Sequence, residues 1–273
     1  MSARESADAV AEAAAVLEDA TRTGFPCAPV RSRLPEDDVE AAYAVQRLLV
    51  ERGVAAGRRP VGRKIGLTSP AVQQQLGVNQ PDFGVLFADM AVPEGQTIAP
   101  GRLLQPKVEA EVALVLGTDL PYRDPTVADL LRATAFALPA LEIVDSRIAD
   151  WDITIVDTVA DNASCGLYVL GGTPVPLDRV DLRAAPMTLT KNGETVSEGT
   201  GADCLGSPLT AALWLASILA DLGDPLRAGE IVLTGALGPM AAAAEGDEFT
   251  AHIDGLGTVT TTFASAATER AAA

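Results

Sequence analysis

The chain of 273 residues is poor in the side chains on which many metal and nucleophilic sites depend. It has one histidine, His252, and three cysteines, Cys27, Cys165 and Cys204, which lie far apart and form no CxxC pair. Zinc motifs built on two histidines or on paired cysteines are therefore excluded. Scattered cysteines in odd number are typical of reduced thiols, and we expect a cytoplasmic protein.

Basic residues are also scarce. Twenty Lys and Arg stand against 37 Asp and Glu, which gives a formal net charge of −17. This excess of negative charge argues against nucleic-acid or anionic-membrane partners. The N-terminus is acidic, unlike a targeting peptide. The most apolar stretch, residues 209–222, is too short to cross a bilayer and is typical of a buried helix.

What the chain does contain is a set of carboxylates inside apolar runs. Glu109 and Glu111 interrupt the strand-like run 107–116, and Glu142 interrupts the run 139–144. Residues i and i+2 of a strand point to the same face, so Glu109 and Glu111 share one side. Because buried carboxylates are costly unless paired or metal-bound, the pattern favours an all-oxygen site for Mg²⁺ or Mn²⁺. A half-exposed strand with two solvated carboxylates is the alternative that the spacing leaves open.

The order of predicted elements indicates an α+β protein. Helical apolar spacing covers residues 6–23, and residues 35–38 open a second helix. From residue 61 strands and turns dominate, so we divide the chain into an N-terminal helical segment, 1–60, and a β-rich catalytic domain, 61–273. The sequence predicts strands at 63–67, 107–116, 138–144 and 230–233, helices at 71–76, 126–137 and 208–223, a loop at 79–84, and hairpins around 191–193 and 254–255.

Several ordered segments resemble the 2-keto-4-pentenoate hydratase family of the fumarylacetoacetate hydrolase superfamily. They are Gly62–Thr68, Gln80–Met90, Lys107–Glu111, Pro139–Glu142 and Asp157–Ser164, with Leu233–Pro239 further along. The resemblance implies a mixed β-roll or sandwich core with an N-terminal helical segment. It also implies assembly into homo-oligomers, and association with a pathway aldolase or decarboxylase is a further expectation.

The activity implied by the resemblance is hydration of 2-hydroxypenta-2,4-dienoate to 4-hydroxy-2-oxopentanoate, in the meta-cleavage degradation of aromatics. The resemblance assigns a Mg²⁺ or Mn²⁺ ion to the positions of Glu109, Glu111 and Glu142. The chain departs from the family at Ser207, where the family usually has His. Ser207 precedes Pro208 and is a good helix N-cap.

Proton transfer needs an acid and a base near the cation, and Lys64 and Asp82 are the candidates. Lys64 lies in an apolar strand, where we expect a lowered pKa; an ordinary strand-edge lysine is the alternative. Asp82 is expected on a loop that presents its carboxylate, unless it is only a turn residue. Asn162 and Ser164 are candidates for holding substrate or water, although such residues commonly cap loops. Thr234 is a candidate for binding the substrate carboxylate.

Three other functions compete with the hydratase. The first is the decarboxylase of the same pathway, which acts on 2-oxo-3-hexenedioate with the same metal chelate. A C–C hydrolase of acylpyruvates is less favoured, because such enzymes use a His-Glu pair and His252 offers no obvious candidate. A non-catalytic partner subunit is disfavoured by the presence of all three glutamates and Lys64.

Overall fold

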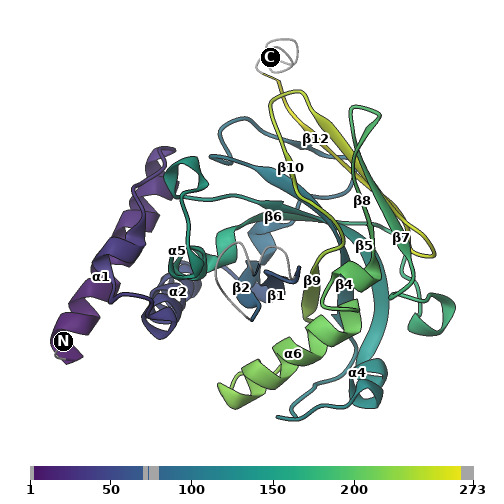
Figure 1. Ribbon diagram of the computed structural model, residues 1–273, viewed down its shortest axis with the longest axis horizontal. Helices are drawn as coiled ribbons and strands as arrows, with labels where there is room; N and C mark the ends of the chain where they lie inside the picture. The colour runs from purple at the N-terminus through teal and green to yellow at the C-terminus, as the bar shows by residue number, and fades with distance from the viewer. Residues whose placement is uncertain (1–2, 70–72, 74–79, 266–273) are drawn as a thin grey trace.

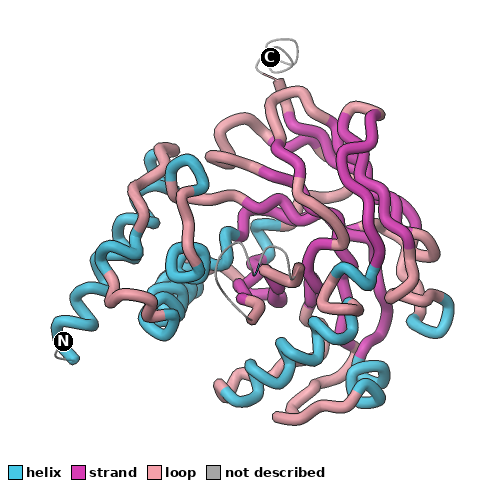
Figure 2. The backbone as a smooth tube through the Cα atoms, viewed as in Figure 1, coloured by secondary structure: helices cyan, strands magenta, loops and turns pink. Residues whose placement is uncertain are grey.

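The computed structural model describes residues 3–69, 73 and 80–265. Helices lie on one side of the molecule and below it, and strands form the rest (Figures 1 and 2). The helices are α1 (Ala3–Thr23), α2 (Val39–Ala55), α4 (Val127–Ala133), α5 (Ile155–Ala160) and α6 (Pro208–Asp221). The strands are β1 (Pro60–Gly66), β2 (Asp82–Phe87), β3 (Thr97–Ile98), β4 (Lys107–Leu116), β5 (Thr134–Val144), β6 (Cys165–Leu170), β7 (Pro186–Lys191), β8 (Glu194–Thr200), β9 (Ile231–Ala236), β10 (Ala241–Ala242), β11 (Glu248–Ile253) and β12 (Gly257–Phe263).

Two sheets form the β core. The larger sheet has the order β2-β1-β9-β4-β5-β6, with β10 added beside β4, and the smaller has the order β3-β12-β11-β7-β8. Most neighbours are antiparallel, whereas β1–β9 and β3–β12 are parallel. One hydrophobic cluster joins the two sheets: it includes alternate residues of β4, such as Val108, Val112 and Leu114, with Leu189 of β7 and Phe249 of β11. The opposite face of β4 is thereby left for other contacts.

The N-terminal helices form a second cluster with α5. Ala14 and Leu17 of α1 and Val45 of α2 pack with Val156 and Val159 of α5. The three helices lie together beside the strand core in Figure 1. Buried Gln46 of α2 donates hydrogen bonds to the carbonyls of Phe83 (2.9 Å) and Val159 (3.0 Å). Helix α2 therefore connects strand β2 to helix α5.

Several local predictions are confirmed. Helices α1, α2 and α6, strands β1, β4 and β9, and both hairpins appear where the sequence indicates them. Asn192 and Gly193 have φ values of 54° and 84°, as a tight hairpin turn of this kind requires. Ser207 caps α6 and accepts a hydrogen bond from the amide of Leu209 at 3.3 Å.

Two local predictions are wrong. The helix expected over 126–137 ends at Ala133, because residues 134–137 form the start of β5 and pair with β4. The loop expected over 79–84 is too long, because Asp82–Gly84 already belong to β2 and pair with β1. A short apolar run does not by itself distinguish a helix from a strand, and a Pro-Asp turn signal does not show where a loop ends and a strand begins. The helix predicted at 71–76 lies, except for residue 73, outside the described residues.

The apolar stretch before Gly223 is a core helix. By length and composition Gly201–Asp221 could cross a membrane. In the structure its α-helical part is the 14-residue α6, which at 1.5 Å per residue reaches about 21 Å, short of a hydrocarbon core. Leu215, Ala216 and Leu219 of α6 are buried in the main cluster. The expectation of a buried helix here is confirmed.

Candidate metal and catalytic site

Glu109, Glu111 and Glu142 meet on the face of the larger sheet that points away from the main core. Glu109 and Glu142 are direct cross-strand partners in the β4–β5 ladder, and Glu111 follows two residues along the same face. Carboxylate oxygens of the three residues all lie within 4.8 Å of one another. Glu111 and Glu142 are fully buried, and Glu109 is partly buried. The grouping predicted from strand spacing is therefore present.

The buried oxygens of this cluster lack partners. Within the part of the chain that the structure describes, Glu111 Oε1 and Glu142 Oε2 accept no hydrogen bond. Glu111 Oε2 accepts one from the backbone amide of Gly235 at 2.8 Å. Unpaired buried carboxylate oxygens are costly. Two carboxylates with such oxygens, together with that of Glu109, fit a hard divalent cation, which takes oxygen ligands.

Burial opposes the charged forms of all three groups, and the charges of neighbouring glutamates add to this effect at Glu109 and Glu111. Burial, followed by the charge of Glu142, raises the pKa of Glu109 to about 7. Burial and the charges of Glu142 and Glu109 raise the pKa of Glu111 well above its ordinary value. Burial also raises the pKa of Glu142, against the opposing effect of Lys64. A bound cation would reverse these shifts, because it favours the ionised carboxylates.

Lys64 of β1 reaches the same cluster. Its side chain is 3% exposed, and its Nζ lies 3.2 Å from Glu142 Oε1 and donates a hydrogen bond to the carbonyl of Ala163 at 2.9 Å. The expected lowering of its pKa is wrong for this arrangement. Burial does lower the pKa of Lys64, but the charges of Glu142 and Asp82 outweigh burial and raise it. Lys64 is therefore an ammonium group that faces carboxylates.

Asp82 occupies the first position of β2, opposite Gly66 of β1. It is 1% exposed, and its Oδ1 has no hydrogen-bond partner among the described residues. Its Oδ2 lies 3.4 Å from Thr158 Oγ1, which is 3.2 Å from Ser164 Oγ. Burial raises the pKa of Asp82, although Lys64 acts in the opposite direction. Gly66 makes room for this carboxylate, since a Cβ there would lie 2.2 Å from Asp82 Oδ1.

The three predicted substrate-binding residues make different contacts in the structure. Ser164 reaches the site through Thr158. Asn162 uses its amide on the backbone of Val85, accepting from N at 2.8 Å and donating to O at 3.0 Å. Thr234 donates its hydroxyl to the carbonyl of Val112 at 2.9 Å. Of the three, Ser164 is the one whose hydrogen bond leads to Asp82, by way of Thr158.

Backbone groups that sequence reasoning did not identify complete the site. The carbonyl of Ala163 contacts Lys64 and the amide of Gly235 contacts Glu111. Gly235 has a φ of +108°, and a Cβ there would lie 2.4 Å from the side chain of Thr68, so this position requires glycine. Thr158 could have been suspected, since it lies inside the segment Asp157–Ser164 that carries the resemblance. Backbone carbonyls and amides that contact a site cannot be identified from the pattern of side chains in the sequence.

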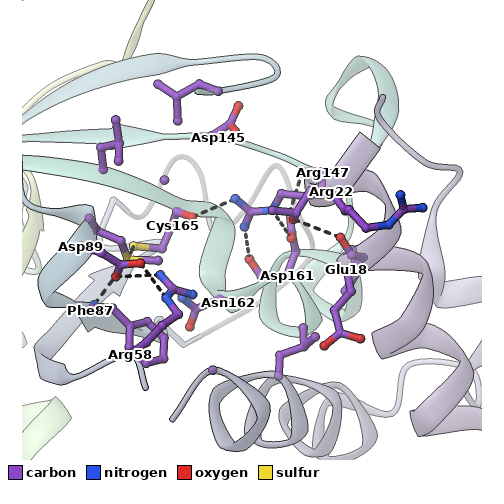
Figure 3. Close-up of a pocket in the computed structure, with 18 of the residues that line it drawn as sticks. Glu18, Arg22, Arg58, Phe87, Asp89, Asp145, Arg147, Asp161, Asn162 and Cys165 are labelled. Carbon is purple, nitrogen blue, oxygen red and sulfur yellow. Dashed lines mark hydrogen bonds and ion pairs between the residues drawn. The ribbon is translucent and has the colours of Figure 1, made fainter. Parts of the chain in front are cut away.

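A cavity of about 500 Å³ lies between the N-terminal helices and β6. Figure 3 shows residues that line it, among them Glu18 and Arg22 of α1 together with Arg147, Asp161, Asn162 and Cys165. Its lining does not include the glutamates, Lys64 or Asp82. This cavity therefore adjoins the back of the segment 161–165 and is separate from the carboxylate cluster.

The chain belongs to the fumarylacetoacetate hydrolase family. The model of the fumarylacetoacetate (FAA) hydrolase C-terminal region matches residues 61–264. The fold is that of this family, a mixed α/β architecture with N-terminal helices and curled sheets, as the sequence predicted.

Individual proteins are similar to this chain over nearly its whole length. The chain is 60% identical over 252 residues to 2-keto-4-pentenoate hydratase 1 of Dechloromonas aromatica strain RCB, covering 92% of this chain and 96% of that protein. It is 60% identical over 258 residues to the TodF product hydratase of Pseudomonas putida F1, covering 94% and 96%. Among solved structures, 4-oxalocrotonate decarboxylase from Pseudomonas putida G7, complexed with magnesium and adipate, superposes with a TM-score of 0.90 at 35% identity, covering 96% of this chain and 99% of that one.

Proposed function

We propose that this chain is a divalent-metal-dependent hydro-lyase that converts 2-hydroxypenta-2,4-dienoate and water to 4-hydroxy-2-oxopentanoate. The observation that carries the proposal is the buried cluster of Glu109, Glu111 and Glu142 beside Lys64 and Asp82. The similarity to proteins named 2-keto-4-pentenoate hydratase supports the choice of substrate.

The three glutamates would hold Mg²⁺ or Mn²⁺. The magnesium in the structurally similar decarboxylase supports a divalent cation. When bound, the cation would supply positive charge for the adjacent carboxylate and 2-oxygen of an α-keto acid. The positive charge of the cation would also explain how a chain of net charge −17 can bind an anionic substrate.

The reaction moves protons and adds one water. The 2-hydroxyl loses a proton, C5 gains one, the water oxygen bonds to C4, and C3 gains the remaining hydrogen. Asp82 is our candidate for the group that moves a proton, because its Oδ1 has no partner among the described residues and burial raises its pKa above the ordinary value. Lys64, held as an ammonium by Glu142, would donate hydrogen bonds and stabilise negative charge on the substrate.

Hydroxyl groups beside Asp82 would position the attacking water. Ser164 and Thr158 form a short chain that ends at Asp82 Oδ2. Ser164 keeps its predicted substrate- or water-binding role in this proposal. Asn162 and Thr234 would have to give up their bonds to Val85 and Val112 to contact substrate directly.

The remaining expectations complete the proposal. We retain the division into residues 1–60 and 61–273; the matched family segment begins at residue 61. We also propose a homo-oligomeric enzyme that works in the cytoplasm and associates with an aldolase or decarboxylase of the same pathway. Size-exclusion chromatography with light scattering tests the oligomer, and co-purification tests the partner.

The decarboxylase is the second candidate, because the magnesium-bound 4-oxalocrotonate decarboxylase shares the fold closely. Purified protein with Mg²⁺ or Mn²⁺ is given freshly generated 2-hydroxypenta-2,4-dienoate in one assay and 2-oxo-3-hexenedioate in another. We expect loss of the dienol absorbance and appearance of 4-hydroxy-2-oxopentanoate. Release of CO₂ from the dicarboxylate without turnover of the dienol would reject the hydratase in favour of the decarboxylase. Lys64→Met, which leaves the glutamates in place, is the matched inactive control.

A further inference from the structure

The segment Asn162–Ser164 between α5 and β6 has an unusual backbone. Its residues have φ values of 54°, 52° and 51°, and none of them is glycine. The left-handed conformation is unfavourable for residues with a Cβ, and consecutive ones are rare. Such strain persists only where the surroundings enforce it, and it gathers at functional sites.

This left-handed turn contacts Lys64 directly and is linked to Asp82 through Thr158. The carbonyl of Ala163 accepts the hydrogen bond of Lys64 Nζ at 2.9 Å. Ser164 Oγ lies 3.2 Å from Thr158 Oγ1, which lies 3.4 Å from Asp82 Oδ2. The positions of the Lys64 ammonium and of this hydroxyl chain therefore depend on the conformation of the turn.

On its other side the turn is held by Arg147. The guanidinium donates from Nε to Asp161 Oδ1 (2.5 Å), from Nη2 to the Asp161 carbonyl (2.6 Å) and from Nη1 to the Cys165 carbonyl (2.8 Å). The backbone amide of Arg147 donates to Asp161 Oδ2 at 2.9 Å. Asp161 and Cys165 are the residues that flank the turn. Figure 3 shows Arg147 between them, at the edge of the cavity.

We propose that Arg147 is a positioning residue for the proposed reaction: its guanidinium bridges both ends of the turn 162–164 and so holds Ala163 and Ser164 against Lys64 and Thr158. The inference rests on the proposed function for its catalytic consequence. Arg147 acts through the backbone: among the described residues its hydrogen bonds go to Asp161 and Cys165, not to the three glutamates. The side chain is 12% exposed and Asp161 is 3% exposed, so solvent competes little for these bonds.

Only a planar fork of donors can make these three bonds at once. Arginine has five N–H donors in fixed geometry, whereas a lysine ammonium is a point donor on a flexible stem. Arg147→Lys keeps the positive charge beside Asp161 but cannot reach both flanking carbonyls. A displacement of about 1 Å at reacting groups can cost about 100-fold in rate. Arg147→Lys therefore distinguishes the effect of the hydrogen-bond geometry of Arg147 from the effect of its positive charge.

The experiment compares Arg147→Met and Arg147→Lys with Arg31→Met as a matched control. Arg31 also binds a buried aspartate of the same region, Asp157, at 2.7 Å, but at the start of α5 and away from the turn. We expect kcat on 2-hydroxypenta-2,4-dienoate to fall about 100-fold in both Arg147 variants, with KM and the Kd for Mn²⁺ changed less than threefold. Arg31→Met should lose stability and keep kcat within threefold.

Hydrogen exchange measured by mass spectrometry gives a readout independent of activity. Peptides covering residues 161–166 should lose protection in both Arg147 variants and keep it in Arg31→Met. The proposal is overturned if either Arg147 variant keeps kcat within threefold, if protection of 161–166 is unchanged, or if Arg31→Met loses as much kcat. Should Arg147→Met fail to fold, Arg147→Lys carries the same test. If the wild-type enzyme does not turn over the dienol, the proposed function fails, and the exchange data still decide whether Arg147 holds the turn.

Discussion

Replacing Glu111 by Gln should make the metal-free protein more stable and at the same time abolish its response to metal. The side chain keeps its shape and can still accept the hydrogen bond from Gly235. It loses one of three carboxylates that each place an oxygen within 4.8 Å of the others. In an effective dielectric of about 20, two unit charges at that separation repel by about 3.5 kcal/mol.

The gain is smaller than this figure, because burial and the charges of Glu142 and Glu109 raise the pKa of Glu111 and so already favour its uncharged form. We expect an increase of roughly 1–3 kcal/mol in the free energy of unfolding at pH 8 without metal. The wild-type protein should gain about 2.7 kcal/mol at a metal concentration of 100 times Kd. Glu111→Gln should gain little from metal.

Urea denaturation in EDTA and in excess Mg²⁺ measures both effects. Asp157→Asn is the matched control, because Asp157 is equally buried but is fully bonded to Arg31 and Thr154. This control should be destabilised with and without metal. If Glu111→Gln were less stable than wild type in EDTA, or were stabilised by Mg²⁺ as strongly as wild type, the metal assignment of the cluster would be refuted.

Four further predictions test other parts of the site and its surroundings. Metal affinity, measured by calorimetry, should fall as the pH drops below about 7, because protons compete for Glu109. The pKa of Glu109 in the folded protein is raised from 4.5 to about 7. The metal-free protein should therefore become more stable as the pH falls from above 7 towards 5. Urea midpoints that decrease as the pH falls over this range would contradict the raised pKa of Glu109. Gly235→Ala should destabilise the fold by roughly 1–3 kcal/mol and weaken metal binding, because the added Cβ would collide with Thr68. In Gly57→Ala, the control, the added Cβ would have no atom within 4 Å, and metal binding should be unchanged. Ser207→Ala should lose about 1 kcal/mol of stability through the missing N-cap and keep kcat; a large loss of kcat in steady-state assays would show that Ser207 acts at the site.

The sequence predicts the carboxylate cluster well because strand periodicity is local information. Spacing alone places Glu109 and Glu111 on one face. The register that brings Glu142 opposite Glu109 depends on long-range pairing, which the sequence did not predict. The apolar context of Glu142 and the family resemblance only grouped it with the other two glutamates. The same local rules predict the Ser207 cap and the Asn192-Gly193 turn.

Other features depend on tertiary contacts that no local pattern carries. The raised pKa of Lys64 follows from Glu142 and Asp82, which lie far away in the sequence. Asp82 starts a strand because β1 offers a pairing edge, although its neighbours favour a turn. The carbonyl of Ala163 at the site depends on a left-handed turn that Arg147 and Asp161 hold from outside.

The central claim is that a cation held by Glu109, Glu111 and Glu142 is required for hydration of the dienol. The direct measurement is the rate of 4-hydroxy-2-oxopentanoate formation, followed by NMR, as metal-stripped enzyme is titrated with Mn²⁺. We predict no turnover in EDTA and a rate that saturates at one Mn²⁺ per chain, with no recovery in Glu111→Gln. Full turnover in EDTA, or equal recovery in Glu111→Gln, would contradict the claim.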